Sequence, residues 1–176
     1  MLNIRLQINI FARLVFFVTA YLLAGVVSAA ESIDVENRLL IIENLAQYSY
    51  RWDGKDSIGF AELFTEDGEM ERRLAGELAS GSLVQGKAAI LDYAQRSHQG
   101  RLADRQTRHH FSGITFLELT SAQAVTENMA LITHQTAGSN PAFISSSGIY
   151  RISWRKTSQG WKMTRRILFS DSFTPQ

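Results

Sequence analysis

Three of the four histidines lie in segments that read as β-strands. "TRHHFSG" (107–113) contains His109 and His110, and "THQT" (133–136) contains His134. Histidine is the side chain best suited to general acid–base chemistry near neutral pH. Two histidines from adjacent strands that converge on one cavity would form a proton-transfer site. The alternative is that each is a hydrogen-bonded structural residue.

The neighbours His109 and His110 must point to opposite faces of their strand. They therefore cannot bind one metal ion together, and only one of them can face a cavity. His110 shares its face with Ser112 and Ile114, and His134 shares its face with the apolar Ala130 and Ile132.

A carboxylate follows the first predicted helix, which spans 33–52. The helix has apolar residues at a helical spacing, at Ile41, Leu45, Tyr48 and Trp52. Asp53 lies at its C-terminal end, where the helix dipole disfavours a negative charge. Asp53 therefore needs a partner or a chemical role, unless it is an Asp–Gly turn residue in water.

The remaining pattern predicts an α+β fold. Asp56 is expected to cap a short helix over 57–64, followed by a turn at 65–68 and a strand that starts in 69–74. A second long helix is expected over 85–99. Strands are then expected over 105–119, 123–137, 142–156 and 160–170. Their connections are too short for parallel crossovers, so these strands should pair antiparallel, curl and leave a cavity on the concave side.

Four segments together resemble the SnoaL-like group of the nuclear transport factor 2-like superfamily. They are "YSYRWDGKDSIGFAELFTEDG" (48–68), "VQGKAAILDYAQR" (84–96), "RHHFSGI" (108–114) and "GIYRISWRKTSQGWKMTRR" (148–166). The resemblance implies a cone-shaped α+β barrel. In this fold, three N-terminal helices pack on a strongly curved, mostly antiparallel sheet around an apolar pocket.

The resemblance also implies a site. In the family's scytalone dehydratase and bile-acid 7α-dehydratases, an acid near the end of the first helix and a strand histidine transfer protons. Asp53 and His110 fall at those positions, and His134 and Tyr48 at those of a further histidine and a tyrosine. Trp52 departs from the pattern of scytalone dehydratase, where a tyrosine precedes the acid.

The expected catalytic set is therefore Asp53, His110, His134 and Tyr48. Asp53 would hold His110 in one tautomer, and His134 or Tyr48 would assist the loss of water. On an ideal helix, however, Tyr48 and Asp53 lie about 140° apart. Tyr50, Trp52 and Phe64 are expected to contact the substrate. Arg165 and Arg166 lie near the end of the meander. One of them could reach a substrate, but solvated charges at a strand edge are the favoured interpretation.

Three function classes follow from these residues. The first is a cofactor-independent lyase or isomerase acting on a small hydrophobic oxygenated ring compound. The second is a non-catalytic secreted module that binds a small molecule or a partner, and a homodimer is a further option. The third, a two-histidine, one-carboxylate metal site made by His110, His134 and Asp53, is weighed lowest. We expect no cofactor and no metal, and the sequence has no cysteine.

Residues 1–30 have the features of a secretory signal peptide. Arg5 and Arg13 precede the apolar stretch "LVFFVTAYLLAGVV" (14–27), and the small residues "SAA" follow. Without the two arginines, 16 basic and 17 acidic residues remain. This balance gives no reason to expect nucleic acid or an anionic membrane as a partner. The alternative to a cleaved signal peptide is a retained N-terminal anchor. The SnoaL-like domain is expected to span 31–176.

We predict that the exported protein begins near Ala30 or Glu31, after cleavage near Ala29–Ala30, in the periplasm or outside the cell. N-terminal sequencing of secreted or periplasmic material would show this start. An intact Met1 in the membrane fraction would instead show an anchor.

Overall fold

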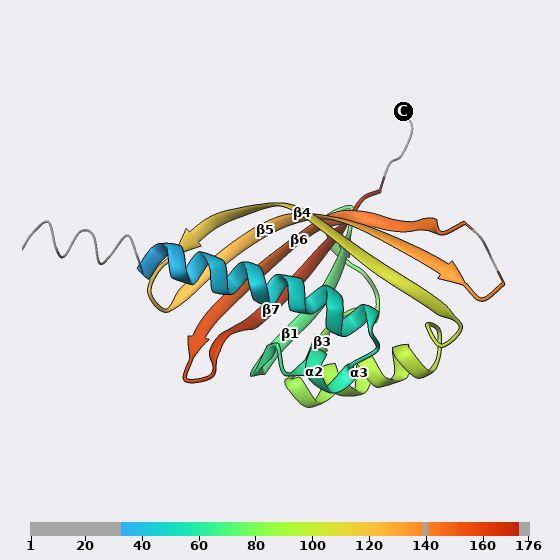
Figure 1. Ribbon diagram of the computed structural model, residues 1–176, viewed down its shortest axis with the longest axis horizontal. Coiled ribbons are helices and arrows are strands. Elements are labelled where there is room, and N and C mark those ends of the chain that lie inside the picture. Colours follow the sequence, from blue (N-terminus) through green and yellow to red (C-terminus); the bar gives the residue numbers. More distant parts are fainter. Residues whose placement is uncertain (1–32, 139–140, 173–176) are drawn as a thin grey trace, which may run out of the picture. The chain divides into compact units, whose positions relative to one another are not determined.

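The computed structural model describes residues 33–138 and 141–172. The expected signal peptide lies outside the described residues. By its contacts the chain divides into Met1–Arg38 and Leu39–Gln176, and the fold and the site lie in the second unit. The expected α+β fold, with helices on a curled and mostly antiparallel sheet, is confirmed (Figure 1).

Three helices are present in the described residues. The first spans 33–53, α2 spans Ser57–Ala61 and α3 spans Lys87–Gln99. The Asp56 carboxylate caps α2 by accepting a hydrogen bond from the Gly59 N–H at 2.8 Å. The expected helix over 57–64 ends three residues early, because Phe64 already belongs to a strand.

The strands are β1 (Phe64–Leu74), β2 (Glu77–Leu78), β3 (Val84–Gln85), β4 (Arg105–Leu119), β5 (Gln123–Thr136), β6 (Phe143–Thr157) and β7 (Gly160–Ser170). They form one sheet in the order β2-β1-β7-β6-β5-β4, and β3 pairs with β1. The four long C-terminal strands pair antiparallel, as expected.

The pairing of β1 with β7 is parallel and was not anticipated. The turn expected at 65–68 lies within β1, where the register shifts between Phe64 and Glu69. The turn-forming residues thus make an irregularity in a strand and do not end it. Since β1 covers one side of β7, the last strand is not an edge strand, and its residues can be buried.

β4 also contains an irregularity. Its register against β5 shifts between Ser112 and Thr115, and Gly113 has a φ of 61°, which favours glycine. A bulge changes which residues of a strand share a face. Phe111 and Ile114, three residues apart, accordingly both pack against the core.

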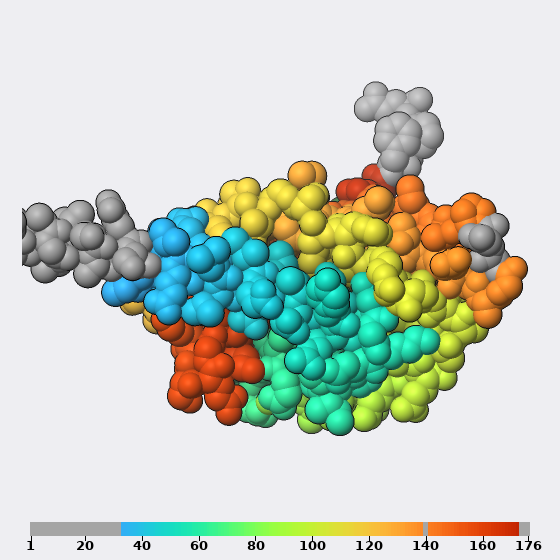
Figure 2. Space-filling view, in the orientation of Figure 1, coloured from blue at the N-terminus to red at the C-terminus, as the bar shows by residue number. Residues whose placement is uncertain are grey.

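The core lies between the helices and one face of the sheet. Tyr48 of the first helix is 4.9 Å from Phe60 of α2 and 5.7 Å from Tyr150 of β6, measured between ring centroids. The buried Trp154 indole donates a hydrogen bond to Thr126 across β6 and β5, at 2.9 Å. In Figures 1 and 2 the first helix, blue to cyan, runs beside β4, which is yellow. Within the described part of the chain, no helix is long and apolar enough to cross a bilayer.

Candidate functional site

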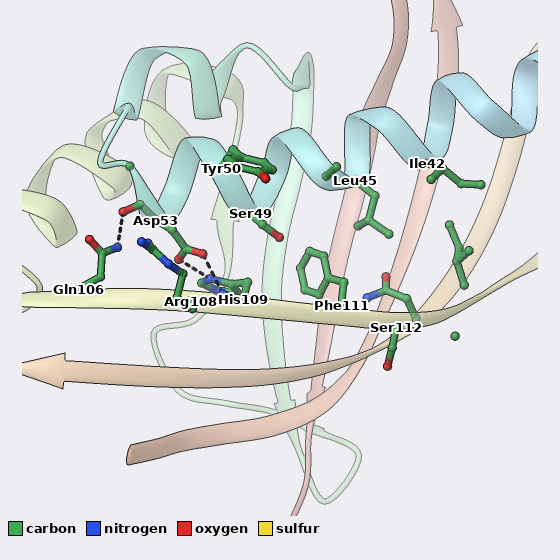
Figure 3. Close-up of a pocket in the computed structure, with 15 residues that line it drawn as sticks. Ile42, Leu45, Ser49, Tyr50, Asp53, Gln106, Arg108, His109, Phe111 and Ser112 are labelled. Atoms are coloured by element: carbon green, nitrogen blue, oxygen red, sulfur yellow. Dashed lines mark hydrogen bonds and ion pairs between the residues drawn. The ribbon is translucent and has the colours of Figure 1, made fainter. Parts of the chain in front are cut away.

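The Asp53 carboxylate joins the end of the first helix to β4. It accepts hydrogen bonds from the Thr107 hydroxyl at 2.6 Å, the His109 backbone N–H at 2.8 Å and His109 Nδ1 at 2.8 Å. Gln106 donates to the Asp53 carbonyl at 2.8 Å. Figure 3 shows the aspartate above β4, with the histidine directly below it. The partner or role that the helix dipole requires for Asp53 is therefore a set of donors on β4.

These contacts determine the charge of Asp53 and the tautomer of His109. Burial disfavours the carboxylate, but the hydrogen bonds and charge of His109 and the Thr107 hydroxyl outweigh it, so the pKa of Asp53 lies below its usual value. An ionised carboxylate only accepts hydrogen bonds, so Nδ1 must carry the proton. In the neutral form of this ring, Nε2 carries the lone pair, and it has no hydrogen-bond partner among the described residues.

The expected pairing of Asp53 with His110 is wrong. His110 lies on the other face of β4, where its Nε2 is 3.2 Å from the Thr133 hydroxyl in an exposed contact. The expectation came from the family resemblance, which placed His110 at the position of the strand histidine. The face that His110 was expected to share with Ile114 is not the core-facing one, because the bulge at Gly113 lies between these two residues and reverses the alternation. His109, expected to be structural, is the histidine that contacts Asp53.

Two cavities meet at His109. The first, which we call the β4 cavity, lies between the first helix and β4 and has a volume of about 690 Å³. Its apolar wall includes Ile42, Leu45, Phe111 and Ile114, and Asp53 lies at one end (Figure 3). Its character suits an apolar ligand.

The second, which we call the tyrosine cavity, lies on the other side of His109 and has a volume of about 440 Å³. Residues that could act on or bind a substrate line it from six elements and the loop after α3: Tyr48, Trp52, Tyr93, Arg101, His109, His134, Tyr150 and Arg166. Several titratable groups around an enclosed volume are typical of a site for chemistry.

His134 lies on the same sheet face as His109 and lines the tyrosine cavity with it. On β5 it is directly opposite Thr107, which donates to Asp53. Burial lowers the pKa of His134 below its usual value, and repulsion from Arg105, Arg101 and His109 adds to this. His134 is therefore neutral at pH 7. It could donate a hydrogen bond from one ring nitrogen, but it would not be an imidazolium acid.

The expected aromatic residues have different positions. Tyr48 is buried in the tyrosine cavity, and burial raises the pKa of its phenol, so it keeps its proton at neutral pH. Trp52 lines the same cavity, with its ring edge-on to His109. Tyr50 is 77% exposed, at the rim of the β4 cavity. Phe64 packs against Phe60 in the core and lines neither cavity, so its expected contact with substrate is not supported.

Sequence reasoning missed two residues of the tyrosine cavity. Tyr150 of β6 was not singled out, and Arg166 of β7 was expected to be solvated although it is only 8% exposed. The alternation in β7 gave an ambiguous signal, because its buried residues are Trp161, Met163, Arg166 and Leu168 and the step of three from Met163 to Arg166 breaks the period of two.

The two-histidine, one-carboxylate arrangement is not formed, because His110 lies on the far face of β4. No group of three or more metal-binding side chains occurs in residues 33–138 and 141–172.

A family model of the SnoaL-like domain matches residues 34–167. The chain therefore belongs to the SnoaL-like family, and the resemblance found in the sequence is confirmed. Among curated proteins, none matches the chain.

Several solved structures share the fold. An NTF2-like protein with a cystatin-like fold from Novosphingobium aromaticivorans has a TM-score of 0.69 at 24% identity, over 83% of this chain and 89% of that one. A candidate scytalone dehydratase from the same organism has a TM-score of 0.68 at 22% identity, over 83% and 93%. A third, the β subunit of a candidate aromatic-ring-hydroxylating dioxygenase, again from that organism, has a TM-score of 0.65 at 16% identity, over 76% and 88%. At these identities the similarity establishes the fold alone.

We predict that Asp53→Asn lowers the free energy of unfolding at neutral pH. The variant should also lose less of this free energy than wild type when the pH is lowered. The folded-state pKa of Asp53 is below the ordinary value of 3.8, so its ionised form stabilises the fold above that pH. This contribution is lost as the pH falls through the lower, folded-state pKa. Losing a buried charged acceptor should cost about 1–3 kcal/mol at pH 7, measured by urea unfolding.

The matched control is Asp92→Asn, which breaks an exposed ion pair with Arg96. It should cost at most about 1 kcal/mol. Equal losses in the two variants at pH 7, or an unchanged acid response in Asp53→Asn, would contradict the proposed stabilisation by Asp53.

Proposed function

We propose that the protein is a cofactor-independent lyase or isomerase that acts on a small hydrophobic oxygenated ring compound in the tyrosine cavity. The observation that carries the proposal is the contact between Asp53 and His109 Nδ1, at 2.8 Å. It leaves Nε2 as a base at the wall of a cavity that holds further proton donors. The membership of the SnoaL-like family and the fold shared with a candidate scytalone dehydratase support this reaction class.

The chemistry begins with proton transfer. His109 Nε2 removes a proton from the carbon beside a ring carbonyl, and Asp53 stabilises the imidazolium that forms. The Tyr48 and Tyr150 phenols, whose pKa values are raised by burial, are protonated and hydrogen-bond each other, so one of them could donate to the developing enolate oxygen. In a dehydration, the carbon–oxygen bond then breaks and the leaving hydroxyl takes a proton from His109 to become water. In an isomerisation, the proton returns to another carbon.

The second candidate function is binding without turnover. The β4 cavity favours it, because that cavity is larger and has an apolar wall. A module of this kind would hold a small apolar ligand beside the first helix and would not require His109 as a base. Both functions agree with the common use of this fold to bind small hydrophobic ligands. We also propose that the protein acts after export, for the reasons given by its N-terminal sequence.

We predict that His109→Ala lowers kcat by about 10²–10⁴-fold, because it removes the proposed base. Asp53→Asn should lower kcat by a similar factor with little change in KM, because the histidine loses its tautomer and its counter-charge. The double variant should lose little more, since the two side chains act together. The assay uses purified protein and a panel of hydroxylated cyclic ketones.

The chain provides a matched control one residue away. His110→Ala removes a histidine from the same strand but from the outer face, and it should retain nearly wild-type rates. If His109→Ala keeps the wild-type rate on a substrate that is turned over, the base has been wrongly assigned. If no compound is turned over but one binds wild type and His109→Ala alike, the binding module is the better description.

A further inference from the structure

Arg166 is a buried cation without a carboxylate partner. It is 8% exposed on β7, and none of the ion pairs formed within residues 33–138 and 141–172 includes it. Glu71 is the nearest acid along the neighbouring strand, but its side chain is bound to Arg73 and Arg165. An arginine cannot lose its proton in a protein, so the positive charge stays in the interior.

The contacts of Arg166 satisfy only part of its guanidinium. One terminal nitrogen donates to the Glu71 carbonyl at 3.0 Å, and the other contacts the Met70 sulfur at 3.3 Å. The guanidinium lies 5.4 Å from the Tyr150 ring centroid and 6.0 Å from that of Tyr48. Nε is buried and has no hydrogen-bond partner. The Tyr48 hydroxyl also forms a hydrogen bond with the guanidinium. A neutral carbonyl, a thioether, a phenol and aromatic rings are weak compensation for a buried charge.

The unpaired charge of Arg166 lies at the wall of a cavity. Arg166 lines the tyrosine cavity with His109 and His134, so its charge borders the space where a ligand would lie. Arg101 and Arg72 line the same cavity, and its one acid, Glu71, is already paired. The electrostatic character of this cavity is therefore positive.

We infer that the ligand of the tyrosine cavity has an anionic oxygen, most simply a carboxylate on its ring system, which pairs with Arg166. A guanidinium binds carboxylates through charge-assisted hydrogen bonds. The Tyr48 and Tyr150 hydroxyls, which hydrogen-bond each other, lie on the same cavity wall and leave one further donor. The inference rests on the proposed location of the substrate in this cavity, but it does not require turnover. It narrows the substrate class from oxygenated rings to ring acids.

Titration calorimetry with a matched pair of probes tests the inference. Sodium 1-naphthoate and neutral 1-naphthamide have nearly the same shape and differ in charge. Wild type should bind the carboxylate about tenfold or more tightly than the amide, as expected for a hydrogen-bonded buried charge. Arg166→Met should lose this preference. Arg165→Met is the matched control, because Arg165 is the next residue but does not line the cavity, and its guanidinium pairs with Glu71 and Glu69.

Two further variants keep the inference testable if Arg166→Met does not fold. Arg166→Gln removes the charge but keeps polar atoms, and Tyr150→Phe keeps the charge but removes one donor. The first should abolish the preference and the second should reduce it. No binding of naphthoate to wild type, equal binding of the two probes, or an unchanged preference in Arg166→Met and Arg166→Gln would each overturn the inference.

The binding experiment can fail or succeed independently of the lyase proposal. His109→Ala should still prefer naphthoate over naphthamide, because the anion contacts Arg166. If the preference depends on Arg166 but no compound is turned over, the anion site is correct and the lyase is wrong. If neutral ketones are turned over through His109 and the protein binds naphthoate no more tightly than naphthamide, the lyase proposal is correct and the anion site is wrong.

Discussion

The attachment of Asp53 to β4 is the interaction on which the site depends. β4 is the last strand in the order of the sheet, so one side of its backbone has no neighbouring strand. An unpaired backbone N–H in a partly buried position needs an acceptor, and the Asp53 carboxylate supplies one to His109. The same carboxylate binds the His109 ring, so one aspartate both holds the edge of the sheet and orients the histidine.

The end of the first helix makes this attachment possible. The chain leaves the helix through Gly54 and Lys55, whose φ of 58° is rare for a residue with a side chain. Asp56 accepts hydrogen bonds from both Arg51 and the Gly59 N–H and so starts α2. Asp56 thus connects the end of the first helix, through Arg51, with the start of α2, through Gly59. These contacts fix the turn at residues 54–55 and with it the direction of the Asp53 side chain. A carboxylate at an unfavourable end of the helix dipole is stabilised because β4 donates three hydrogen bonds to it.

Most of the fold could be predicted from the sequence because long strands with short connections leave few arrangements. The bounds of β4 and β7 agree with the predicted segments. β5 ends one residue early, and β6 is shifted by one residue at both ends. Asp53 could also be predicted as a site residue, since its place at the helix end required an explanation. The histidine was assigned from the family resemblance, because periodicity alone gives two faces and does not say which of them is the core face. A closer reading of Thr107, His109 and Phe111 against the polar Arg108, His110 and Ser112 would have favoured His109.

The burial of Arg166 was missed because of the topology of the sheet. Its charge is also less well compensated by the protein than the charge of Asp53. A charged pair near the end of the last strand suggests a solvated edge, but the parallel strand β1 covers that edge and buries one member of the pair. The two buried charges of the site are then unequal. Asp53 has its hydrogen bonds supplied by the protein, whereas Arg166 has a charge with no counter-ion and a buried Nε with no acceptor. The tyrosine cavity borders the unsatisfied cation but not Asp53, and its one acid, Glu71, is paired, so an anionic group of a ligand would lie most favourably at Arg166, with the rest of the ligand toward His109.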